Sequence, residues 1–120
     1  MTAKEELAGR VRTILAKQRG VTEKAMFGGI CFMVRGHMCC GALKQDLVVR
    51  LGPERYEHAL AKPHVRPMNF TGRPLRGFVF VGPQGTHTQR ALTYWIEQGV
   101  AYVQTLPAKP KQKIQATRNR

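Results

Sequence analysis

Residues 30–51 read ICFMVRGHMCCGALKQDLVVRL, and this stretch decides the fold. Apolar side chains recur at every second position within it, which is the period of β-strands. Turn-forming residues interrupt the pattern twice. The three runs that remain are 30–35, 38–43 and 47–51. The stretch therefore predicts a three-stranded antiparallel meander.

The two turns predict the register of this meander. Gly36-His37 has glycine first, which is typical of a two-residue type II′ hairpin, and Gln45-Asp46 forms the second turn. The first turn places Val34 opposite Cys39 and Met33 opposite Cys40. One face then carries Ile30, Phe32 and Val34, with Cys39, Gly41 and Leu43 opposite them. Cys31 and Cys40 share the other face with Met33 and Met38.

Amphipathic and β-rich patterns flank the meander on both sides. Helical spacing of apolar residues predicts a helix over 3–18 and a second over 86–104. A short helix starts at Pro53, an edge strand covers 66–70, and a strand covers 77–81. We therefore expect an α+β fold: an antiparallel sheet, made of the meander and one or two further strands, flanked by N- and C-terminal helices.

The apolar faces of these elements predict one shared core. Its expected members are Leu7, Val11, Phe32, Val34, Leu47, Val49, Val79, Leu92, Trp95 and Ile96. A chain of 120 residues can bury one such core but not two. We expect a single domain over residues 1–107 and a basic, disordered tail over residues 108–120.

Charge is the dominant feature of the composition. Twenty Lys and Arg against seven Asp and Glu give a net charge of +13. Such a chain attracts polyanions, so we expect nonspecific, electrostatic binding of DNA, to which the tail contributes. Residues 58–96 contain no acid. The basic residues of the tail are Lys109, Lys111, Lys113, Arg118 and Arg120.

The strongest candidate site inside the domain is an arginine-rich turn. Arg66, Arg73 and Arg76 surround a Pro/Gly turn where they could converge on an anion. Asn69 and Thr71 add hydrogen-bonding groups. In the alternative interpretation Phe70 packs in the core and the arginines are merely solvated.

Several classes of catalytic site lack their residues. The chain has no serine, which excludes a Ser-His-Asp triad, and Asp46 is its only aspartate. Gly28-Gly29 lacks the spacing of a phosphate-binding loop. The cysteines form no CxxC pair, so we expect no metal and no cofactor. We assign no catalytic residue; the one alternative left open is a Cys–His nucleophile that uses His37, His58, His64 or His87.

The chain shows no secretion signal and no apolar run long enough to span a membrane. Its three cysteines do not make a disulfide framework. We expect a cytoplasmic location, reduced thiols, no membrane partner, and a monomer or a homodimer.

Several ordered motifs resemble the TfoX N-terminal domain family over residues 4–110. They are Met26-Phe27-Gly28-Gly29, Cys31-Phe32-Met33, Gly36-His37-Met38-Cys39-Cys40-Gly41, Val49-Arg50-Leu51-Gly52-Pro53-Glu54 and Arg66-Pro67-Met68-Asn69-Phe70-Thr71-Gly72-Arg73-Pro74-Leu75-Arg76-Gly77. The helix that contains Trp95 and the segment 106–110 resemble the single-domain branch.

This resemblance implies a helix-flanked antiparallel sheet similar to the secretion-chaperone-like folds, and no known catalysis. Full-length TfoX and Sxy proteins regulate competence genes in bacteria, together with the cyclic-AMP receptor protein at promoters. They carry a C-terminal domain, in whose place this chain has a basic tail. That difference puts the competence role in doubt.

Two hypotheses follow. In the first, the chain is a non-catalytic regulatory or interaction module whose partner is a transcription factor or DNA. In the second, it is a small-molecule or redox-responsive domain, or an uncharacterised enzyme, that uses the hairpin cysteines or the arginine-rich turn.

Overall fold

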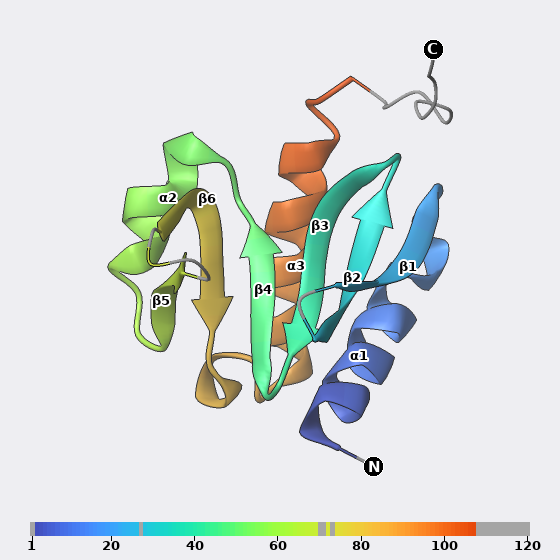
Figure 1. Cartoon of the computed structure of the whole chain (residues 1–120), viewed down its shortest axis with the longest axis horizontal. Coiled ribbons are helices and arrows are strands. Elements are labelled where there is room, and N and C mark those ends of the chain that lie inside the picture. Colours follow the sequence, from blue (N-terminus) through green and yellow to red (C-terminus); the bar gives the residue numbers. More distant parts are fainter. Residues whose placement is uncertain (1, 27, 70–71, 73, 108–120) are drawn as a thin grey trace.

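The chain folds as a six-stranded antiparallel sheet in the order β1-β2-β3-β4-β6-β5 (Figure 1). The computed structural model describes residues 2–26, 28–69, 72 and 74–107. The strands are β1 (Val21–Met26), β2 (Gly29–Val34), β3 (His37–Leu43), β4 (Asp46–Arg50), β5 (Val65–Asn69) and β6 (Pro74–Val81). The helices are α1 (Ala3–Ile14), η1 (Leu15–Lys17), α2 (Pro53–Leu60), η2 (Pro83–Gly85) and α3 (Gln89–Val103).

Capping residues and a proline in the local sequence fix where each of the three α-helices begins. The Thr2 hydroxyl accepts from the Glu5 amide, and the Glu5 carboxylate accepts from the Thr2 amide, which forms a capping box before α1. Pro53 occupies the first turn of α2, where its missing N–H costs nothing. Thr88 caps α3 by accepting from the Ala91 amide.

Two of the helices cover one face of the sheet. α3 packs on β3 and β4, and α1 packs on β3 and β2; both lie behind the sheet in Figure 1. The shorter α2 packs against β6 and β5. Within the described residues, the opposite face of the sheet carries no helix. We call it the helix-free face.

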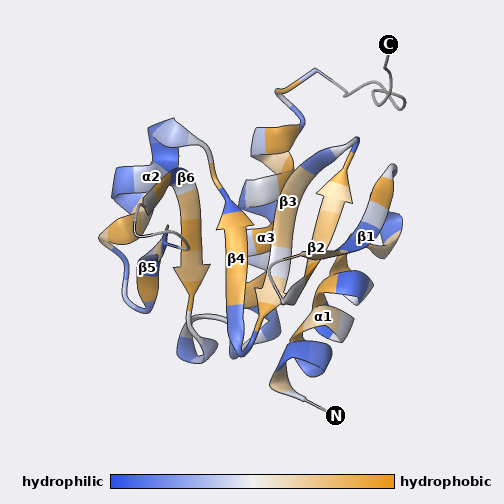
Figure 2. Cartoon of the chain, viewed as in Figure 1, coloured by the Kyte–Doolittle hydropathy of each residue, from blue (hydrophilic) through white to orange (hydrophobic). Residues whose placement is uncertain are grey.

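The core lies between the sheet and the helices. All ten predicted core residues belong to one buried cluster, so that prediction is confirmed. The strands β2, β3, β4 and β6 are largely hydrophobic, whereas α1 and α2 alternate between hydrophobic and hydrophilic positions (Figure 2). The predicted α+β class, with an antiparallel sheet and a helix at either end, is also confirmed.

The predicted register of the first hairpin is wrong. Its two-residue loop is Arg35-Gly36, with φ of 55° and 85°, and Val34 pairs with His37. Two positive φ angles match a type I′ loop, whose twist suits a two-stranded ribbon. Glycine therefore fills the second loop position and not the first. The next turn is also displaced by one residue, because Leu43 pairs with Asp46.

A β-bulge places the cysteines differently from the prediction. Phe32 pairs with Cys40 and Met33 pairs with Met38, so Cys39 is the extra residue of the bulge. Cys39 and Cys40 both lie in the helix-side core. Cys31 pairs with Gly41 on the opposite face, apart from Cys40.

The sheet has one strand more than the sequence predicts. β1 forms an edge with four consecutive exposed residues, 22–25, and this polar run hides the strand from a hydrophobic pattern. Glu23 lies on this strand. The other edge strand, β5, agrees with the prediction apart from its last expected residue, which is outside the described residues.

Candidate partner-binding surface

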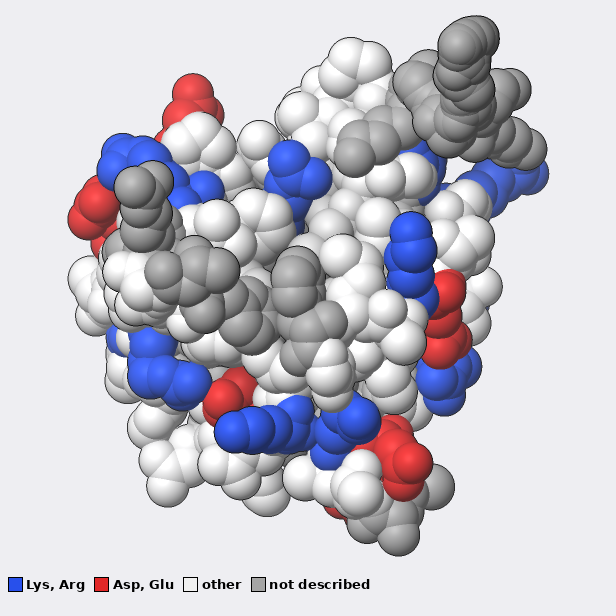
Figure 3. All heavy atoms as spheres, in the orientation of Figure 1, with Lys and Arg blue, Asp and Glu red and all other residues white. Residues whose placement is uncertain are grey.

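One row of paired residues crosses the whole helix-free face. The pairing joins Lys24 to Cys31, Cys31 to Gly41, Gly41 to Val48, Val48 to Phe80, and Phe80 to Arg66. Cys31 and Val48 are buried in the middle of the row, and Lys24 and Arg66 are exposed at its two ends. The face therefore has an apolar centre and basic edges. Figure 3 views the molecule from this side and shows basic side chains around the margin, with fewer acidic ones between them.

Three basic side chains from distant parts of the sequence gather at one end of this face. We call Lys4, Lys44 and Arg66 the basic edge. Arg66 Nη2 lies 3.0 Å from Asp46 Oδ2, and Lys4, Lys44 and Asp46 line one shallow pocket of about 480 Å³. The single carboxylate leaves the group with an excess of two positive charges.

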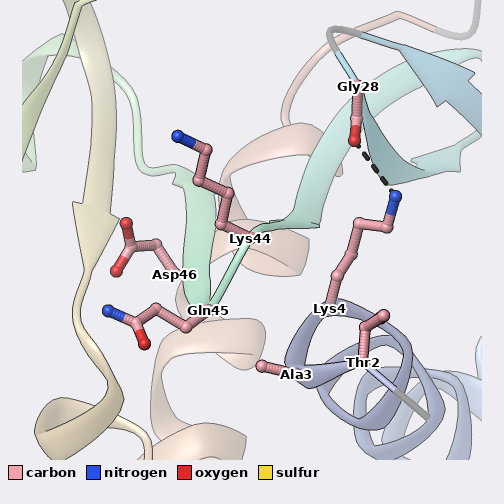
Figure 4. Close-up of a pocket in the computed structure, with 7 residues that line it drawn as sticks. All are labelled: Thr2, Ala3, Lys4, Gly28, Lys44, Gln45 and Asp46. Carbon is pink, nitrogen blue, oxygen red and sulfur yellow. Dashed lines mark hydrogen bonds between the residues drawn. The ribbon is translucent and has the colours of Figure 1, made fainter.

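These three side chains come from three different elements. Lys4 is in the first turn of α1, and its Nζ donates to the Gly28 carbonyl at 3.2 Å. Lys44 is in the β3–β4 turn with φ of 57°. In Figure 4, Lys44 and Asp46 extend from that turn on one side of the pocket, and Lys4 and Thr2 lie on the α1 side. Arg66 extends from β5 and lies over the Phe80 ring, 5.0 Å from its centroid.

The arginine-rich turn is described only in part. Arg66 faces Asp46, whereas Arg76 pairs with Glu57 of α2 at 3.7 Å and lies 5.7 Å from the centroid of the Tyr56 ring. The two arginines thus have different acidic partners on different elements. Asn69 is exposed on β5, opposite Pro74. Arg73 and Thr71 lie outside the described residues, and so do the basic residues of segment 108–120.

The cysteines are buried, and the pKa values of two of them are raised. Burial raises the pKa of the Cys31 thiol. The pKa of the Cys40 thiol is raised well above its ordinary value, first by a hydrogen bond with the Cys39 side chain and then by burial. All three are free cysteines. A protonated, buried thiol is a poor nucleophile, which weakens the hypothesis that uses the hairpin cysteines.

The histidines and acids of the described ranges do not gather into a metal site, since no three or more His, Cys, Asp or Glu side chains could hold an ion there. His37 is buried, and one of its ring nitrogens, Nε2, lies 2.5 Å from the Pro107 carbonyl oxygen. Its other nitrogen, Nδ1, has no hydrogen-bond partner among the residues that the structure describes. This contact joins the β2–β3 hairpin to the residues after α3.

Comparison with known families identifies the family of the chain. The TfoX N-terminal domain family matches residues 13–102 of the 120. The chain belongs to the TfoX N-terminal domain family. The resemblance of the ordered motifs is thereby confirmed, and most of the TfoX match lies in the sheet, α2 and α3.

Neither the curated proteins nor the solved structures contain a match to this TfoX-family chain. None of its described helices is both long and apolar enough to cross a membrane.

Sequence reasoning missed Lys4 and Lys44. They are 40 positions apart, and only the packing of α1 beside the β3–β4 turn brings them to one pocket. Lys44 carried one weak signal, because a turn residue between two strands is exposed and free to bind. Nothing in the sequence around Lys4 distinguishes it from a solvated helix lysine.

Proposed function

We propose that this TfoX-family domain is a non-catalytic regulatory module that acts in transcription at DNA, where it contacts the phosphate backbone by charge without reading the base sequence. The observation that carries this proposal is the basic edge: Lys4 and Lys44 line one pocket with Asp46, and the Asp46 carboxylate pairs with Arg66. Lysine and arginine side chains at a surface bind phosphates and release counterions from DNA.

The charge of the whole described region supports the same proposal. Fourteen of its residues are Lys or Arg and seven are Asp or Glu, and only three of the basic residues are in ion pairs there. Phosphate contacts position a protein on DNA but carry no sequence information. An acidic surface of a transcription factor would fit the same side chains, and this is the alternative partner.

The test is a salt titration of duplex DNA binding with two unrelated sequences. The triple variant Lys4→Gln/Lys44→Gln/Arg66→Gln removes three charges and keeps the side chains at similar length. Each phosphate contact contributes about 0.9 to the slope of log K against log salt, so the slope should become shallower by up to about 3. Affinity for both sequences should fall together.

A matched control removes three charges at the opposite end of β3. Lys17, Arg19 and Arg35 lie near the β2–β3 loop, away from the basic edge. Their triple Gln variant should leave most of the affinity and the slope intact. Equal losses in both triple variants would show that binding follows net charge alone. A hundredfold preference for one DNA sequence would show base reading and overturn the proposal.

A further inference from the structure

A second concave site lies away from the basic edge, between α2 and α3. We call it the α2–α3 cleft. Its volume is about 310 Å³, within the roughly 300–1,000 Å³ of small-molecule sites. The lining residues are Leu51, Glu54, Arg55, His58, Ala59, Lys62, Tyr94, Trp95 and Gln98. All of them are among the described residues.

The inner surface of the cleft is apolar and aromatic. Leu51, Ala59 and Trp95 are each 6% exposed or less and belong to the hydrophobic core. Tyr94 stands at the rim, 41% exposed, with its ring edge-to-face to Trp95 at a centroid distance of 5.1 Å. An exposed tyrosine above a buried tryptophan offers a planar ligand a surface on which to stack.

The α2 side of the cleft is basic. Arg55 Nη1 donates to Gln98 Oε1 across the cleft, and Lys62 Nζ lies 5.7 Å from the centroid of the Tyr94 ring. Neither Arg55 nor Lys62 is in an ion pair with any described residue. Glu54 is the one acid in the lining. Two cations without an acidic partner in the described ranges, beside the exposed Tyr94 ring, therefore favour a ligand that carries negative charge next to a ring.

We infer that the α2–α3 cleft binds small planar aromatic anions, such as an aromatic carboxylate, sulfonate or phosphate monoester. The ring of the ligand stacks against Tyr94 and the edge of Trp95, and its anionic group accepts hydrogen bonds from Arg55 and Lys62. The cleft is a separate site from the basic edge. It gives the TfoX-family domain a place for a small effector as well as for a polyanion.

The test measures the binding of naphthalene-2-sulfonate, the probe, to the full chain by calorimetry and by two-dimensional NMR. A ligand of this size that fits the cleft should bind with a dissociation constant of about 1 mM or below. The NMR shifts should concentrate in residues 54–62 and 94–98. The uncharged 2-naphthol and the ring-free methanesulfonate should each bind at least about tenfold more weakly, because each keeps only half of the recognised chemistry.

Variants separate the cleft from the general charge of the chain. The double variant Arg55→Gln/Lys62→Gln should weaken the probe at least about tenfold, and Tyr94→Ala should weaken it by several-fold. The control Lys17→Gln/Arg19→Gln removes the same charge elsewhere and should change the affinity less than about twofold.

Three results would overturn the inference. The first is 2-naphthol binding as tightly as the sulfonate, which would indicate an apolar patch only. The second is a result that indicates general charge: either methanesulfonate binds as tightly as naphthalene-2-sulfonate, or the control variant lowers the affinity for the probe as much as the cleft variant does. The third is NMR shifts that lie outside the cleft.

Discussion

Gly52 joins β4 to α2 in a conformation that only glycine adopts easily. Its φ is 88° and its ψ is 160°, a region that costs other residues about 1–3 kcal/mol. A Cβ at this position would also lie 2.4 Å from two ring carbons of Tyr102. Space and backbone geometry therefore exclude a side chain at the same point.

We predict that Gly52→Ala lowers the free energy of unfolding by about 2–4 kcal/mol, because backbone strain and overpacking add. Gly9→Ala is the matched control. Gly9 lies inside α1 and a Cβ there meets nothing within 4 Å, so alanine should stabilise the helix by up to about 1 kcal/mol. Urea unfolding followed by circular dichroism measures both, and equal effects would contradict the structure.

The thiols give stability a dependence on pH. In the folded chain the pKa of Cys31 is raised by burial, and that of Cys40 is raised by its hydrogen bond with Cys39 and by burial. The unfolded chain therefore loses these protons first as pH rises. It then binds fewer protons than the folded chain, and the free energy of unfolding falls with pH.

We predict that this loss begins near the ordinary thiol pKa of about 8.5 and continues upward until the folded thiols ionise. Below pH 8 the two thiols should contribute no slope. Urea midpoints at pH 7, 8, 9 and 9.5 measure the effect. A Cys31→Ala/Cys40→Ala variant should be less stable at pH 7 but flatter between pH 8 and 9.5. A wild-type profile as flat as that of the variant would refute the assignment.

At the scale of elements, the β2–β3 hairpin holds a non-glycine residue in the left-handed region. Arg35 has φ of 55° beside Gly36 at 85°. Left-handed geometry costs an ordinary L-residue about 1–2 kcal/mol, whereas Asn adopts it more readily and Asn-Gly is a preferred pair for type I′ loops.

We predict that Arg35→Asn raises the free energy of unfolding by about 0.5–1 kcal/mol. Gly36→Ala should lower it by about 1–2 kcal/mol, because alanine meets the same left-handed penalty. Thermal unfolding at neutral pH distinguishes the two. If the loop were the predicted Gly36-His37 pair, Arg35→Asn would bring no such gain.

The helices and strands also show how much of the fold can be predicted from the sequence. The helical spacing of apolar residues, the Pro53 start and alternating strands are local patterns, and they predicted α1, α2, α3 and most strands. The predicted register was wrong for two reasons: the loop is Arg35-Gly36 and not Gly36-His37, and a bulge at Cys39, which no local pattern reports, shifts the pairing again. β1 was missed because its exposed residues carry no period-two hydrophobic signal.

At the scale of the whole molecule, the candidate site depends on packing that no local pattern reports. Arg66 was predicted from its own segment. Its companions Lys4 and Lys44 join it only through the docking of α1 and the pairing of β5 with β6 beside β4. Charge could be read from the composition, but its gathering at one end of the sheet could not.

We predict that the deletion of residues 108–120 lowers the affinity of the chain for duplex DNA. The segment carries five basic residues and no acid, so the salt slope should become shallower by up to about 4. The measurement is the same duplex titration, with the full chain beside the deletion. The domain should keep its circular dichroism spectrum, since the buried core cluster is formed by residues between Leu7 and Val103. Unchanged affinity and slope would exclude the segment from the contact.

The two edge strands bear on how copies of the chain meet one another. An unpaired strand edge is a template for another strand, and proteins guard it with charge or proline. β1 presents exposed Glu23 and Lys24, and β5 contains exposed Pro67, which has no N–H to donate. Neither edge of the sheet therefore pairs readily with a strand of another copy. The protein should resist forming fibrils through its own strands, even at high concentration.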